Sequence, residues 1–196
     1  MLYLRRPTPA ALQQLLADQS PRDFSYPDVG ITRDATPADA SDAYVVDHAR
    51  VLLGRGEEVY RVAIIAIENW QQFDLGWLEA YPTNAPLEPS VTVAVVARVL
   101  GSWSAHCARI VYKIDGQHGS NKRFGFAYGT LPAHMEAGEE RFQVEWNTAT
   151  GEVHYDILAY SRPRHILAKL GYPLVRRLQK RFGRDSAARM QYLTSS

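Results

Sequence analysis

Between residues 75 and 161 the sequence repeats one pattern, a run of β-forming residues followed by a short break rich in turn-forming residues. Six such runs cover residues 75–81, 91–100, 107–115, 122–130, 140–146 and 152–161. Several of them alternate apolar and polar side chains, which is typical of strands with one buried face. Because the breaks are short, consecutive strands are expected to pair as antiparallel hairpins. The pattern therefore predicts a meander.

The regions on both sides of this meander predict one more strand and two helices. Residues 43–53 form a β-type run that ends at the turn signal Gly54-Arg55-Gly56. An apolar stripe over residues 59–73 then recurs at helical spacing for nearly five turns. A second stripe covers residues 167–182. Since proline is disfavoured inside a helix, we expect a short helical turn to about residue 170 and a long helix that starts near Pro173.

The first 42 residues are predicted to pack onto the main domain, which spans residues 43–196. Thr8 has the character of a helix N-cap, and Pro9 suits the first helical position. Prolines and a glycine punctuate the following residues 20–41, so an ordered loop is expected there. A length of 196 residues fits a single domain overall.

Composition limits the classes of protein that this chain can belong to. Hydrophobic residues make up 46%, which suffices for a sizeable core. No run of about 18 apolar residues exists, so no membrane span is predicted. The first residues lack the features of a signal peptide, and the single Cys107 excludes an internal disulfide and a cysteine-based zinc site. We expect a cytoplasmic protein without cofactor or metal.

The order strand, helix, six antiparallel strands and long helix resembles the helix-grip fold of the START-like and birch-pollen-allergen-like superfamily. The resemblance implies an α+β fold in which a curved antiparallel sheet of about seven strands wraps around a long C-terminal helix. In that superfamily a hydrophobic cavity usually lies between sheet and helix. Its members carry lipids, sterols or plant hormones, or cyclise polyketides, and they share no catalytic residues.

Several motifs are similar to those of a narrower family of bacteria and plants. They are FAYGTLPAH at residues 126–134, GEERF at 138–142, SRP at 161–163, LGRG at 53–56 and FDLGW at 73–77. This resemblance, to the family called domain of unknown function nineteen-ninety, covers nearly the whole chain. It implies no particular activity.

The strand at residues 122–130 has two unlike faces. Phe124, Phe126 and Tyr128 share one face, and Gly125 and Gly129 lie on the other with Ala127. One interpretation makes the aromatic side chains core residues and the glycines points of sheet curvature. The other makes the aromatic face the lining of a pocket, because glycine weakens a strand unless something must approach closely. We favour the first interpretation and keep the second open.

His134 is followed closely by Glu136, Glu139 and Glu140. An imidazole with carboxylates can form an acid–base pair or a metal site. The spacing matches no recognised set of metal ligands, so a solvated loop with charges at a hairpin end is favoured. If the loop borders a cavity, the same residues form a polar gate.

Other candidate sites are weaker. Gly54 and Gly56 lack the third glycine and the βαβ unit of a dinucleotide-binding motif, which excludes that reading. A buried Arg109 could anchor a ligand carboxylate, although an outward position is favoured. Cys107 and His106 are adjacent on a strand and should point to opposite faces, so they are not expected to form a catalytic pair.

The charges are distributed unevenly. From Arg162 onward the chain carries nine of its 22 basic residues and one of its 21 acidic residues. The face that holds Arg176, Lys180 and Arg184 could bind an anionic surface. The chain has no recognised nucleic-acid-binding motif, so nucleic acid is an unlikely partner, and a solvated face that pairs with the acidic remainder is favoured.

The leading hypothesis is a protein that binds a hydrophobic or amphipathic small molecule between the sheet and the C-terminal helix. The predicted ligand-binding residues are Trp77, Phe124, Phe126, Tyr128, His134, Glu140 and Tyr155. An enzyme on the same scaffold, such as a cyclase, isomerase or hydrolase of an apolar substrate, is the alternative, with Tyr128, His134 and Glu140 as acid–base groups. A third hypothesis is an interaction module that uses the basic helix on an anionic partner.

Overall fold

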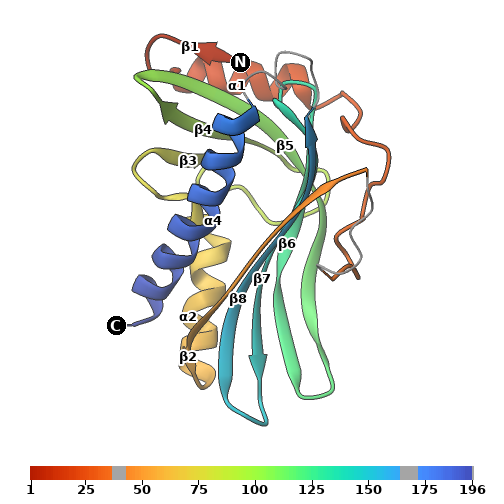
Figure 1. Ribbon diagram of the computed structural model, residues 1–196, viewed down its shortest axis with the longest axis vertical. Helices are drawn as coiled ribbons and strands as arrows, with labels where there is room; N and C mark the ends of the chain where they lie inside the picture. Colours follow the sequence, from red (N-terminus) through yellow and green to blue (C-terminus); the bar gives the residue numbers. More distant parts are fainter. Residues whose placement is uncertain (37–42, 164–171, 196) are drawn as a thin grey trace.

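The strands of the protein form one antiparallel sheet, seen in a computed structural model that describes residues 1–36, 43–163 and 172–195 (Figure 1). Seven strands follow the order β2-β8-β7-β6-β5-β4-β3, and the short β1 pairs with β5. The strands are β1 (Leu2–Tyr3), β2 (Val45–Arg55), β3 (Leu78–Tyr81), β4 (Thr92–Val99), β5 (Ser102–His118), β6 (Asn121–Thr130), β7 (Glu136–Asn147) and β8 (Glu152–Pro163). The order confirms the predicted meander, with β2 added beside the last strand.

The helices are distributed unequally between the two faces of this sheet. They are α1 (Pro9–Gln19), α2 (Glu57–Glu68), the 3-10 turn η2 (Gln71–Phe73) and α4 (Tyr172–Thr194). In Figure 1, α2 and α4 lie on the same side of the curled sheet. The main hydrophobic core fills the space between them and joins residues such as Ile67, Phe126, Phe142 and Phe182. A curled sheet packed against a long C-terminal helix is the predicted helix-grip architecture.

The long helix begins where its sequence predicts. Tyr172 is its first residue, and Pro173 therefore falls in the first turn, where a missing backbone N–H costs little. The predicted helical turn that ends near residue 170 lies outside the described residues. None of the helices in the described ranges has the length and apolarity that a membrane crossing requires.

Several predicted boundaries were wrong. Strand β7 begins at Glu136 and not at residue 140, so Glu136, Glu139 and Glu140 lie in a strand and not in the solvated loop that the sequence favoured. The apolar stripe of residues 59–73 does not form one helix, because α2 ends at Glu68 and Trp70 adopts a left-handed backbone with φ of 55° before η2 begins. Trp70 buries its ring against Phe126, with ring centroids 4.7 Å apart, so tertiary packing holds the break. Strand β5 starts at Ser102, five residues earlier than periodicity indicated, since its first half pairs with β4 throughout.

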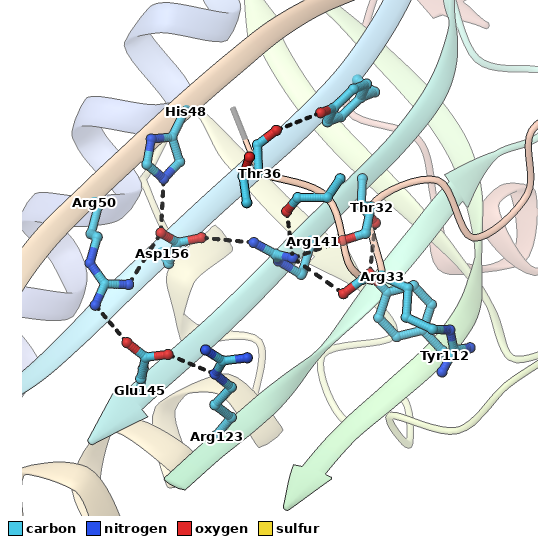
Figure 2. A network of polar contacts seen from close by, with 12 residues as sticks. Thr32, Arg33, Thr36, His48, Arg50, Tyr112, Arg123, Arg141, Glu145 and Asp156 are labelled. Carbon is cyan, nitrogen blue, oxygen red and sulfur yellow. Dashed lines mark hydrogen bonds and ion pairs between the residues drawn. The ribbon is translucent and has the colours of Figure 1, made fainter. Parts of the chain in front are cut away.

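The N-terminal residues cover the outer face of the sheet. Thr8 caps α1 as predicted, and its hydroxyl accepts a hydrogen bond from the amide of Ala11 at 3.2 Å. Residues 20–36 then run along the side of the sheet opposite to α2 and α4 (Figure 1). Figure 2 shows the guanidinium of Arg141 reaching the backbone of this segment, where it donates to the carbonyl of Thr32 at 2.7 Å. The same guanidinium contacts Asp156 at 3.3 Å, within a network that also holds His48, Arg50, Arg123 and Glu145.

The outward glycines of β6 allow other chain segments to approach. A Cβ on Gly129 would lie 2.2 Å from the hydroxyl of Tyr26, which belongs to the N-terminal segment. A Cβ on Gly125 would lie 2.0 Å from the carbonyl oxygen of Phe142 in β7. Glycine is required at both positions because the neighbouring atoms occupy the space of a side chain. The aromatic side chains of the same strand belong to the main core, as the favoured interpretation held, and Tyr128 lines a cavity as well, as the alternative held.

Candidate ligand-binding cavity

A cavity of about 700 Å³ lies between the sheet and the N-terminal half of α4. The helices α2 and η2 cover the inner face of the sheet elsewhere and leave this end open. Several lining positions carry alanine or glycine, which are too small to fill the space: Ala49, Ala97, Ala159 and Gly183. Larger apolar residues, among them Phe73, Ile157 and Phe182, complete the walls. The lining is therefore mostly apolar.

The cavity extends to the protein surface at the same end of the molecule. Leu2, Leu100, Met135 and Leu174 belong to its lining, and all four are exposed. They come from β1, from the turn between β4 and β5, from the segment before β7 and from α4. Apolar side chains from four separate parts of the chain therefore border the entrance.

Tyr128 and Glu140 form the first polar pair of the cavity wall. They lie opposite each other on β6 and β7, and the Tyr128 hydroxyl donates a hydrogen bond to Glu140 Oε2 at 2.9 Å. Burial raises the pKa of Glu140 to about 8, against the opposing effect of the hydrogen bond from Tyr128. Burial also raises the pKa of the Tyr128 phenol, with the nearby Glu140 adding to the effect. At neutral pH Glu140 holds a proton in most molecules.

Glu136 is the second carboxyl group of the wall. Its two oxygens each lie 2.7 Å from Gln179 Nε2, which donates from α4. Burial raises the pKa of Glu136 to about 7, and Asp47 adds to this rise while Arg176 opposes it. Arg176 itself is paired with Asp47 through two hydrogen bonds, one of 2.7 Å from Nη2 to Oδ1.

Two histidines complete the polar part of the cavity. The rings of His106 and His134 lie with centroids 5.0 Å apart. His106 Nε2 is 3.0 Å from the Ser104 hydroxyl, and His134 Nδ1 accepts a hydrogen bond from the Glu136 amide at 3.1 Å. Burial, with the neighbouring His134, lowers the pKa of His106 well below its ordinary value, so this imidazole is neutral at physiological pH.

The structure brings four of the predicted site residues into the cavity and leaves three outside. Trp77, Tyr128, His134 and Glu140 belong to the lining. The others, Phe124, Phe126 and Tyr155, lie in the main core, where the Tyr155 hydroxyl is 3.1 Å from that of Ser186. These three side chains therefore do not line the cavity.

Reasoning from the sequence missed several polar residues of the cavity, among them His106, Asp47 and Gln179. His106 was considered only as a partner of Cys107, and Asp47 was not considered at all. Both lie on the cavity side of the sheet. The alternation of β5 was the available signal for His106, because it places this residue on the same face as Ser104 and Ile110.

The remaining candidate residues from the sequence hold other parts of the protein together. Arg109 faces outward and donates to the carbonyls of Ser20 at 2.7 Å and Arg22 at 2.5 Å, which fixes the N-terminal segment. Cys107 is buried against α1 on the face opposite to His106, and burial raises its pKa to about 11. Both findings confirm the favoured interpretations. Glu139 belongs to the cavity lining, but its carboxylate accepts hydrogen bonds from the N-terminal segment.

The basic face of α4 is partly paired with acids, as favoured from the sequence, and within the described residues Arg177 and Lys180 form no ion pair. Arg176 pairs with Asp47 of β2, and both Arg181 and Arg184 pair with Asp185 of the helix itself. In the described part of the chain, no three His, Cys, Asp or Glu side chains gather in a group that could hold a metal ion.

The chain is similar to proteins of one family over most of its length. Residues 25–189 match the family described as "Domain of unknown function (DUF1990)". A UPF0548 protein of Dictyostelium discoideum is 34% identical over 203 residues, covering 97% of this chain and 94% of the relative. Another from Deinococcus radiodurans is 32% identical over 197 residues, with coverages of 95% and 96%. A third, from Arabidopsis thaliana, is 37% identical over 149 residues, with coverages of 74% and 71%.

Solved structures show similarity in fold at low sequence identity. A hypothetical protein from Helicobacter pylori aligns with a TM-score of 0.50 at 10% identity, covering 88% of this chain and 96% of the other. Human STARD10 aligns with a TM-score of 0.41 at 10% identity, with coverages of 93% and 80%. The match over residues 25–189 and the long alignments with UPF0548 proteins confirm the resemblance seen in the motifs, and the chain belongs to the DUF1990 family.

Proposed function

We propose that the protein binds a hydrophobic or amphipathic small molecule in the cavity between the sheet and α4. The observation that carries the proposal is the cavity of about 700 Å³ with its apolar walls and few polar groups. Ligand pockets have volumes of roughly 300 to 1,000 Å³ and the same mixture of lining groups.

The cavity wall offers two kinds of surface to a ligand. Phe73, Ile157 and Phe182 offer an apolar surface, where each buried methylene group of a ligand contributes about 0.8 kcal/mol. Tyr128 and Glu140 offer hydrogen bonds to a polar group. A molecule with an apolar body and one polar end therefore fits better than a wholly apolar one.

The test combines native mass spectrometry with binding of a neutral fluorescent probe, N-phenyl-1-naphthylamine. Gently purified wild-type protein is expected to carry a small molecule or to bind the probe with an increase in fluorescence. Ala159→Trp places a large side chain in the cavity and is expected to abolish both signals. Ala149→Trp introduces the same side chain in the exposed turn between β7 and β8 and serves as the control. Equal probe binding by both variants would refute the proposal.

A second function is favoured by one observation, the hydrogen bond between Tyr128 and Glu140 inside the cavity. A carboxylic acid with a pKa of about 8 can donate a proton to a bound molecule at neutral pH and take it back later. Acid–base catalysis on an apolar substrate would use this pair. Incubation with a metabolite extract tests it, because wild-type protein should convert at least one compound that Glu140→Gln leaves unchanged. Identical product profiles would exclude this role.

A further inference from the structure

We propose that the ligand carries a protonated amine, which the carboxyl groups of Glu136 and Glu140 attract into the cavity. The inference rests on the proposed binding function and adds the chemical class of the ligand. Its basis is the mismatch between the two carboxyl groups and the groups that the protein itself places beside them.

Both carboxyl groups have neutral hydrogen-bond partners. Glu140 accepts from the Tyr128 hydroxyl through one oxygen, and its other oxygen has no partner among the described residues. Glu136 accepts from the side-chain amide of Gln179. Neither group forms an ion pair within the ranges that the structure describes. A buried carboxylate without a cation is costly, and a cationic ligand supplies the missing charge.

The other charged groups around the cavity form no ion pair with these two acids in the described part of the chain. The titratable and charged side chains that line it are Asp47, His48, His106, Tyr128, His134, Glu139, Tyr160, Lys180 and Arg184. Arg176 lies close enough for its charge to oppose the rise in the pKa of Glu136, but its guanidinium pairs with Asp47. Asp47 is engaged by Arg176, and His106 is neutral. Lys180 and Arg184 are exposed on α4, and Arg184 pairs with Asp185. An anionic ligand would therefore meet carboxyl groups in the cavity wall, whereas an ammonium group would be attracted to them.

Binding of an ammonium group must favour the ionised form of the carboxyl groups. Without a cation beside it Glu140 is mainly protonated at neutral pH, because burial raises its pKa to about 8. The cation lowers that pKa, so binding releases a proton to solvent. Such an acid is ionised in about 1% of molecules at pH 6 and in about half at pH 8. Affinity for a cationic ligand should therefore rise at least tenfold over this range.

The experiment compares four probes with the same twelve-carbon chain by displacement of N-phenyl-1-naphthylamine from wild-type protein. The probes are dodecylammonium, dodecyltrimethylammonium, 1-dodecanol and dodecanoate. At pH 8 the two cations are expected to bind at least tenfold more tightly than the alcohol and the carboxylate. Their affinity should fall at pH 6, while that of the alcohol should not change. Calorimetry in two buffers of different ionisation enthalpy should show proton release with the cations alone.

Variants identify the groups responsible. Glu140→Gln and Glu136→Gln are each expected to reduce the preference for the cations at least fivefold, with binding of 1-dodecanol retained as a check of folding. Glu152→Gln removes a carboxyl group that pairs with Arg55 outside the cavity and should preserve the preference. If 1-dodecanol binds as tightly as the cations, the inference is wrong and the proposed function stands. If no probe and no fluorophore binds, the proposed function fails as well.

Discussion

Replacement of Glu139 tests the role of the N-terminal segment most sharply. This residue lies on β7 and is only 2% exposed. Its carboxylate accepts hydrogen bonds from the Tyr26 hydroxyl at 2.6 Å, the Gly30 amide at 2.7 Å, and the amide and hydroxyl of Thr32 at 3.0 and 2.5 Å. One side chain thus holds three residues of the segment against the sheet. We expect Glu139→Ala to detach residues 20–36 from the outer face.

The magnitude follows from these four contacts. A hydrogen bond to a charged group contributes about 1.5 to 3 kcal/mol. The four hydrogen bonds here share one carboxylate, and in the variant the detached donors form hydrogen bonds to water instead. We therefore expect Glu139→Ala to lower the free energy of unfolding by about 3 to 5 kcal/mol, less than the separate contacts would give. Glu139→Gln keeps one acceptor oxygen and turns the other position into a donor that faces the Gly30 amide, so about half of this loss is expected.

Urea denaturation followed by tryptophan fluorescence measures the loss, and hydrogen exchange locates it. The amides of Gly30 and Thr32 should exchange faster in Glu139→Ala, whereas amides in β8 should not. Glu152→Ala, which removes a carboxyl group outside this contact, should cost no more than about 1 kcal/mol. A loss below about 1 kcal/mol in Glu139→Ala, with unchanged protection of the two amides, would refute the reasoning. Residues 20–36 would then not belong to the same cooperative unit as the sheet.

Three further predictions concern the core and the cavity. Folding raises the pKa of Glu140 from 4.5 to about 8, so between these pH values the folded protein binds more protons than the unfolded chain. The free energy of unfolding should therefore fall as the pH rises through that range. Glu140→Gln should flatten this fall in denaturation measured at pH 5, 7 and 8, and an unchanged slope would contradict the prediction. Gly125→Ala should cost about 1 to 3 kcal/mol in urea denaturation, since its Cβ would overlap the backbone of Phe142, while Gly116→Ala, with nothing within 4 Å, should cost far less; equal costs would show that the strands separate easily. The buried Cys107, with its pKa raised to about 11, should react with a disulfide reagent at pH 7.4 only after unfolding, and rapid reaction of the native protein would contradict its placement.

The fold was predictable because its signals are local. Alternation within each run and short breaks between runs specify a meander, and Pro173 marks the start of α4. The end of α2 was not predictable, since the residues after Glu68 continue the apolar spacing and only the packing of Trp70 on Phe126 breaks the helix. Local periodicity contains no information about that distant contact.

The cavity was predictable in part for a similar reason. Alternation places Phe124, Phe126 and Tyr128 on one face of β6, as observed. It does not say where along the strand the helices lie. Phe126 is covered by Trp70, whereas Tyr128, two residues further along, borders the cavity. Position along the strand depends on how the elements pack in three dimensions, so the sequence alone could not separate core residues from cavity residues.

Nuclear magnetic resonance of the labelled protein during titration with N-phenyl-1-naphthylamine tests the central claim most directly. The account predicts saturable shifts concentrated on cavity residues such as Phe73, Tyr128, Ala159 and Phe182, with little change in the outer-face residues around Arg141. The same shifts should disappear in Ala159→Trp. Shifts that fall on the outer face, or that never saturate, would contradict the claim that the space between the sheet and α4 is a ligand-binding cavity.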